Sequence, residues 1–157
     1  MADAEASRDT VIALNASAAF NVWAGFEVAS AAAGSAELRL AWRPGFGQYA
    51  GFLHAAMIGG MLDTACGFAA FTLVGPVMAS HFSVDCLAPA AGDTFVARGR
   101  VVKAGRRQVF SHAELFAIRG AEERLVATGG AILVPITPAP DVARAARVSG
   151  DPVDRPA

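Results

Sequence analysis

The stretch between Arg43 and Asp85 carries a single Asp, Glu, Lys or Arg, namely Asp63, which lies in the middle of a long apolar run. From residue 55 to residue 73 the bulky apolar side chains occupy most faces of a helix, so this segment is expected to be buried on most sides. A carboxylate inside such a helix loses solvation worth several kcal/mol unless something compensates. Asp63 is therefore expected either to pair with another group in the fold or to have a functional role.

The positions three, four and seven residues from Asp63 all carry small side chains, and they share one helical face. They are Ala56, Gly59, Gly60, Cys66, Gly67 and Ala70. Because each glycine inside a helix costs roughly 1 kcal/mol relative to alanine, this face is expected to allow close approach by another group. One interpretation is tight packing by a helix or strand that also pairs with Asp63. The other is a substrate channel in which Asp63 is the reactive carboxylate.

The 157 residues have a net charge of −1 and no dense basic block, which argues against nucleic acid as a partner. Asp63, His54 and the glycines interrupt the apolar run, and no Lys/Arg cluster flanks it, which argues against a membrane span. Residues 1–8 contain no apolar segment of a secretory signal, so we expect a cytoplasmic protein. Neither Cys66 and Cys86 nor the three histidines have the spacing of a metal site.

Periodicity and turn residues predict an α+β fold in one domain over residues 9–136, with a flexible N-terminus over 1–8 and a mobile tail over 137–157. Helices are expected over residues 7–20 and 55–73. Strands are expected over residues 26–29, 36–42, 78–87, 94–103, 108–118 and 124–134. The first two strands would form a hairpin and the last four an antiparallel meander. Such a sheet can bury the long apolar helix by wrapping around it.

Two groups of residues occur at characteristic spacings. The first lies in the loop before the expected helix 55–73 and within that helix, and the second follows the expected strand 78–87. They comprise Gln48, Gly51, His54, Leu62, Asp63 and Ala65, and then Pro89, Gly92 and Asp93. This pattern resembles the hotdog-fold acyl-CoA thioesterases, in particular the PaaI type of phenylacetate degradation. The resemblance implies a hotdog fold, an antiparallel sheet wrapped around one long central helix. It also implies hydrolysis of an acyl-CoA thioester without a cofactor.

The resemblance also implies roles for single residues. Asp63 would be the general base or the nucleophile, and the backbone N–H of Ala55 would bind the thioester oxygen. Gln48 would position the water or the carbonyl, and His54 would brace the loop. The sequence departs from the family pattern where Ala55 and Ala56 replace a double glycine. It departs again where Ala79, with Ser80 beside it, replaces a residue that often holds water.

The spacing of Asp63 and Ala55 bears on assembly. A helix N-terminus carries about half a positive charge and free N–H groups, so it suits a carbonyl that gains negative charge. However, nine residues of helix span about 13 Å, so one helix cannot bring both groups to one carbonyl. If both groups act on the same thioester, they come from different subunits. This predicts a two-fold homodimer, which could pair further into a tetramer.

The remaining candidates are expected to bind substrate. On the helix these are Ala56, Gly60 and Gly67, and on the following strand Ala79, Ser80 and His81. Lys103, Arg106 and Arg107 form the densest basic group and are candidates for the phosphates of coenzyme A, although they also fit a solvated turn. Phe20, Trp23 and Phe26 fit either an acyl pocket or the core.

Three functions fit these residues. The first is an acyl-CoA thioesterase acting on a medium-chain, long-chain or aryl acyl group. The second is a non-catalytic hotdog protein that binds acyl-CoA as a sensor or carrier, which the alanines at 55, 56 and 79 favour. The third is a hotdog hydratase or dehydratase, but the His/Asp or His/Glu placements of those enzymes do not occur around His54. A fold alone does not decide among them.

Overall fold

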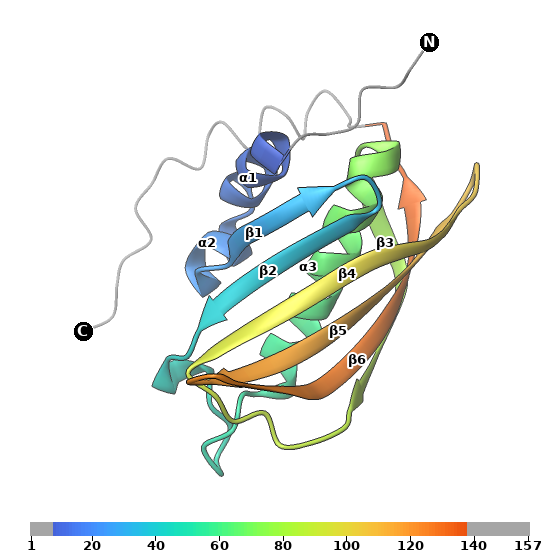
Figure 1. Cartoon of the computed structure of the whole chain (residues 1–157). Helices are drawn as coiled ribbons and strands as arrows, with labels where there is room; N and C mark the ends of the chain where they lie inside the picture. Colours follow the sequence, from blue (N-terminus) through green and yellow to red (C-terminus); the bar gives the residue numbers. More distant parts are fainter. Residues whose placement is uncertain (1–7, 138–157) are drawn as a thin grey trace.

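The computed structural model describes residues 8–137. Three α-helices and six strands follow one another as α1 (Arg8–Ser17), α2 (Ala19–Ala24), β1 (Glu27–Ala32), β2 (Ser35–Ala41), α3 (Ala55–Val74), β3 (Val77–Cys86), β4 (Thr94–Ala104), β5 (Val109–Arg119) and β6 (Glu122–Pro135). A short 3₁₀ turn, Pro44–Phe46, precedes α3. The strands form one antiparallel sheet that curves around α3 (Figure 1). The predicted α+β hotdog fold is confirmed.

α3 is the core element of the molecule. It begins after His54, whose Nδ1 accepts a hydrogen bond from the amide of Ala56, and it ends at Gly75, which has a positive φ of 74°. Its length and composition are those of a membrane span, but 61% of its most apolar window is buried under the sheet, as in the core helix of a globular domain. Gly99 of β4 lets the sheet approach α3 closely, because a Cβ there would overlap the carbonyl of Ala65.

The strand order is β1-β2-β4-β5-β6-β3, which corrects the predicted meander. Only β4, β5 and β6 follow one another in space, whereas β3 lies at the far edge beside β6. The chain returns from that edge along residues 87–93, where the amides of Leu87 and Ala88 donate to the carbonyl of Val126. The turn residues of this connection mark where β3 ends, but they do not specify which strand it joins.

The predicted N-terminal helix is divided into α1 and α2 at Ala18, whose backbone is extended. α2 packs on the middle of α3, where a Cβ added at Gly60 would lie 3.1 Å from the ring of Phe20. The guanidinium of Arg43 donates to the last two carbonyls of α2 at 2.8 and 2.7 Å. Arg8, which was expected to be flexible, donates to carbonyls of β1 at 3.2 Å. The other residues expected to be flexible lie outside the described range, apart from Thr137.

Candidate active site

Asp63 lies at the middle of α3 and is half-buried. Its Oδ1 atom is fully buried and has no hydrogen-bond partner among residues 8–137. Burial raises the pKa of this carboxyl above its ordinary value of 3.8. Among residues 8–137 nothing pairs with the carboxylate, so it is free to accept a proton from a group that enters the cavity.

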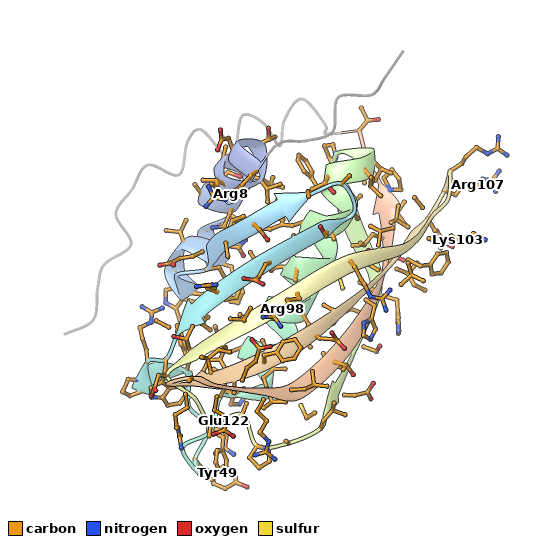
Figure 2. The ribbon with its side chains drawn as sticks, viewed as in Figure 1. Arg8, Tyr49, Arg98, Lys103, Arg107 and Glu122 are labelled. Carbon is orange, nitrogen blue, oxygen red and sulfur yellow. The ribbon has the colours of Figure 1, made fainter. Side chains whose placement is uncertain are left out.

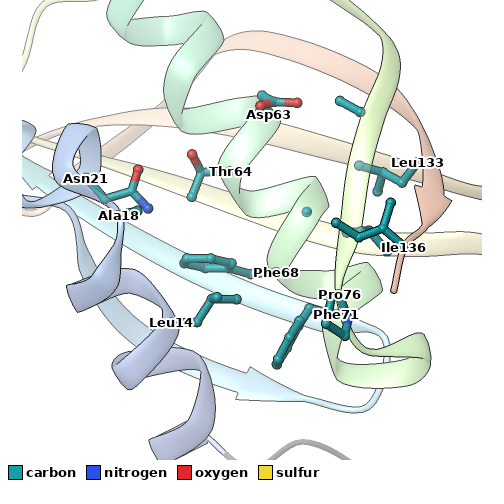
Figure 3. A pocket seen from close by; sticks show the side chains of 13 residues that line it. Leu14, Ala18, Asn21, Asp63, Thr64, Phe68, Phe71, Pro76, Leu133 and Ile136 are labelled. Atoms are coloured by element: carbon teal, nitrogen blue, oxygen red, sulfur yellow. The ribbon is translucent and has the colours of Figure 1, made fainter. Parts of the chain in front are cut away.

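A cavity of about 430 Å³ opens beside Asp63, between α3, the α1–α2 segment and β3 (Figure 3). Most of its wall is apolar and comes from four elements and the segment after β6: Leu14, Phe68, Phe71, Val77, Leu133 and Ile136. Its polar side chains are those of Asp63, Thr64 and Asn21. The cavity can therefore receive an apolar group whose reactive end lies at a carboxylate.

Part of the α3 face that carries small residues packs against neighbouring elements, and another part borders the cavity. Gly60 is covered by Phe20 of α2, and a Cβ at Gly59 would lie 3.6 Å from Phe82 of β3. The cavity instead borders Gly67, where an added Cβ would meet no atom within 4 Å. Packing by neighbouring elements thus accounts for the first two glycines, while Gly67 leaves open space next to Asp63. Gly60, which was expected to bind substrate, does not line this cavity.

The three predicted site residues on β3 do not all face the cavity. Ala79 lines the cavity, but Ser80 lies at a bulge, where its hydroxyl donates to the carbonyl of Ile132 at 3.1 Å. Because side chains alternate along a strand and Phe82 contacts α3, His81 points away from the helix. Only one of these three predicted residues therefore faces the cavity.

The N-terminus of α3 forms a second group of predicted residues. The amide of Ala56 is used by His54, whereas the amide of Ala55 donates no hydrogen bond within residues 8–137. Gln48 lies in the preceding loop, and its Oε1 accepts from the amide of Ala50. More than two helical turns separate Ala55 from Asp63, so one chain does not bring these groups together.

The basic residues lie at the tip of the β4–β5 hairpin. Lys103 is the second-last residue of β4, and Arg106 and Arg107 lie in the following turn; all three side chains are exposed. Figure 2 shows Lys103 and Arg107 projecting from the tip. None of the three takes part in an ion pair within the described range.

Several lining residues were not anticipated from the sequence. Leu14, Asn21, Phe71 and Ile136 are far apart in the chain and carry no shared motif. Of the aromatic residues considered for a pocket, Phe26 is buried in the core and none of the three lines the cavity. The one available signal was Asn21, an amide within an otherwise apolar segment.

Cys66 and the residue types that bind metals are the other reactive groups to consider near this site. Burial and the nearby charge of Asp63 raise the pKa of the Cys66 thiol to about 12, so the reactive thiolate does not form at neutral pH. Across residues 8–137, no three side chains of His, Cys, Asp or Glu gather as metal ligands do. Asp63 is the one ionisable side chain among the residues that line the cavity.

Comparison with known proteins places these observations in a family. Residues 50–123 match the family model of the thioesterase superfamily. A thioesterase family protein from Silicibacter pomeroyi is 35% identical, with a TM-score of 0.77 over 79% of this chain and 93% of that one. The fold is also similar to that of E. coli PaaI, from the phenylacetic acid degradation operon (21% identity, TM-score 0.73, 80% of this chain and 89% of that one). It is likewise similar to zebrafish thioesterase superfamily member 2 (22%, 0.73, 83% and 99%). No curated protein matches the chain.

Proposed function

This chain belongs to the thioesterase superfamily, and from that premise we propose that it hydrolyses an acyl-CoA to the free acid and coenzyme A. The observation that carries the proposal is Asp63, a half-buried carboxylate that lies beside an apolar cavity and has no partner in the described part of the chain. The cavity suits a fatty or aryl acyl group, and the carboxylate suits the thioester carbonyl at its end.

Asp63 can act by either of two routes. As a general base it takes a proton from water while the oxygen of that water attacks the carbonyl carbon. The C–S bond then breaks, and the departing thiolate recovers the proton. As a nucleophile its oxygen attacks the carbonyl carbon and the C–S bond breaks, which releases the coenzyme A thiolate to take a proton from solvent and leaves an acyl-enzyme anhydride. Water then hydrolyses this anhydride, which frees the acid and restores the carboxylate. Its raised pKa makes it a stronger base than a carboxylate in water, which serves the first route directly.

The oxyanion of either route requires hydrogen-bond donors. We assign this role to the amide of Ala55 in a second copy of the chain, because that amide has no partner within residues 8–137 and lies at the positive end of α3. Such a donor is commonly worth about 3 to 4 kcal/mol in the transition state. His54 holds the first turn of α3 in place by capping it, and Gln48 supplies its amide nitrogen to the water or the carbonyl.

The first test is the substitution Asp63→Asn, assayed by thiol release from a panel of short, long and aryl acyl-CoA thioesters. We expect a folded protein whose kcat/KM falls by at least about a thousandfold. Retained turnover in a well-folded variant would remove Asp63 from the mechanism. Binding without turnover in the native chain would favour the alternative function, an acyl-CoA sensor or carrier. The methyl groups of Ala55 and Ala79 near the thioester path support that alternative.

The shared site is tested by mixing two inactive variants. Asp63→Asn removes the carboxylate. Ala55→Pro replaces the amide hydrogen by a ring methylene and should leave the helix intact, because proline is compatible with the first position of a helix and with the extended backbone of His54. A mixed dimer contains one site with both groups intact, so refolding the two variants together should restore about a quarter of native activity. No recovery would place the two groups outside a common site.

The basic tip of the β4–β5 hairpin is proposed to bind the phosphates of coenzyme A. Changing both Arg106 and Arg107 to Ala should raise KM several-fold at low salt, with a smaller effect at high salt. The matched control is an acyl-N-acetylcysteamine thioester, which lacks the phosphates and should show no change. An unchanged KM for acyl-CoA at low salt would contradict this role.

A further inference from the structure

The wall of the cavity formed by α1 and α2 contains one residue that its structural surroundings do not fully explain. Asn21 is only 6% exposed, and it faces a cavity whose lining is otherwise mostly apolar. The residues of this wall come before residues 50–123 in the chain. They therefore lie outside the segment that matches the family model of the thioesterase superfamily. The side-chain oxygen of Asn21 accepts no hydrogen bond within residues 8–137, whereas its nitrogen donates one.

A short chain of hydrogen bonds fixes the orientation of this amide. Asn15 donates through Nδ2 to the carbonyl of Phe26 at 2.8 Å, so its Oδ1 atom must be an acceptor. The Nδ2 of Asn21 donates to that Oδ1 at 3.1 Å. The nitrogen of Asn21 is therefore directed at α1, and the chain of hydrogen bonds does not use its oxygen. Asn21 lies beside Thr64, across the cavity from Leu133 and Ile136 (Figure 3).

The backbone of Asn21 has a separate structural role. Its carbonyl accepts from the amides of Gly25 at 2.9 Å and Phe26 at 3.0 Å, which closes the end of α2. Any side chain at position 21 leaves these two bonds in place. The single bond to Asn15 holds the side chain, but it needs only the nitrogen. The oxygen thus remains as an acceptor for whatever occupies the cavity.

We propose that Asn21 is a specificity-determining residue whose oxygen accepts a hydrogen bond from a hydroxyl group on the acyl part of the substrate. The proposal rests on the thioesterase function proposed above. An apolar acyl group would fill the cavity but leave the amide oxygen buried without a donor, whereas a hydroxylated one would satisfy it. Discrimination of this kind arises because the site's own polar group is left unpaired with the wrong substrate.

The test compares matched pairs of thioesters that differ by one hydroxyl. The pairs are phenylacetyl-CoA with its ring-hydroxylated forms, and hexanoyl-CoA with its 3-, 4- and 5-hydroxy forms. In the native chain kcat/KM should be at least about tenfold higher for one hydroxylated member than for its parent. Asn21→Leu, which is similar in size but has no acceptor, should bring that ratio close to one.

Asn15→Ala is the companion variant, because it removes the two hydrogen bonds that fix this amide, to Phe26 and to Asn21, but keeps the oxygen of Asn21 in the chain. It should lower stability as Asn21→Leu does and should weaken the hydroxyl preference without abolishing it. Equal kcat/KM within every pair for the native chain, or the same preference in Asn21→Leu, would overturn the proposal. If no thioester is hydrolysed, the thioesterase function fails. Calorimetric affinities for the same pairs then decide the role of Asn21, and equal affinities would overturn it.

Discussion

The substitution Gly67→Ala separates a substrate cavity from a packed interface at the α3 face that carries small residues. Gly67 lies one helical turn beyond Asp63, and a Cβ built on it meets no atom within 4 Å. Within this chain, the extra methyl group would enter the cavity and contact nothing else. The change therefore tests what occupies that space in the working protein.

Two contributions set the expected magnitude. Alanine is favoured over glycine inside a helix by about 1 kcal/mol, and no steric cost offsets this gain because the space is open. For a chain of this size, 1 kcal/mol corresponds to a rise in Tm of about 2 to 4 °C. The same methyl group narrows the cavity next to the reacting carbonyl. Overfilling such a space costs about 1 to 3 kcal/mol, so kcat/KM for bulky acyl-CoA thioesters should fall by roughly five- to 150-fold.

The assay is thermal unfolding at a fixed protein concentration, together with thiol release from acetyl-CoA and from a long or aryl acyl-CoA. Gly60→Ala is the matched control within the same helix, because its methyl group would lie 3.1 Å from the ring of Phe20. The control should gain little or no stability. In Gly67→Ala the loss of activity should be confined to bulky acyl groups.

A lower Tm in Gly67→Ala would refute this reasoning. It would mean that another protein segment, such as a second copy of α3, fills the space that this chain leaves open. Unchanged turnover of every thioester in a stabilised variant would show that the acyl group does not pass Gly67.

Three further predictions concern pH, packing and capping. In the proposed mechanism Asp63 acts in its ionised form, so kcat/KM should fall as the pH drops through its raised pKa. The midpoint of the acid limb in a pH–rate profile should therefore lie above 3.8, and a midpoint at or below that value contradicts this role. The sign for stability is opposite: a raised pKa favours the folded state at low pH, and this contribution is lost as the pH rises from 3.8 through the raised value. Gly99→Ala should cost at least about 3 kcal/mol in a denaturant titration, because the new methyl overlaps the carbonyl of Ala65, and an unchanged midpoint would contradict this close approach. His54→Ala should cost about 1 kcal/mol by loss of the bond from the amide of Ala56, whereas His54→Asn should keep most of it, and equal melting temperatures for the two variants would contradict a capping role.

The central features of the fold were predictable because their signals are local. A long apolar run ending at Gly75 and Pro76 predicted α3, and alternation with clear turn residues predicted all six strands to within a few residues. Two features were not local. The break at Ala18 depends on how α2 packs against α3, and the position of β3 beside β6 depends on which sheet edge remains free after β4, β5 and β6 have paired.

In the candidate site, too, some residues could be predicted from the sequence and others are brought together only by the fold. Asp63 could be identified from sequence because a lone carboxylate in an apolar helix is costly, and that cost is visible without a structure. The cavity beside it could not be identified, since Leu14, Phe71 and Ile136 meet only after the sheet has curved around α3. Asn21 is informative only once Asn15 and Phe26 are seen to fix its nitrogen.

α3 contains one hydrogen-bond acceptor and one donor that lack partners, and they lie too far apart along the helix to bond to each other. The buried oxygen of Asp63 has no donor, and the amide of Ala55 has no acceptor, within the described part of the chain. A two-fold arrangement of two copies would place each carboxylate near the other copy's helix N-terminus, and a thioester between them would need both. The free outer edge of β3 offers a surface for such pairing. Because a monomer lacks half of each site, the dimer would then be the smallest active unit, and folding and catalysis would depend on the same contact.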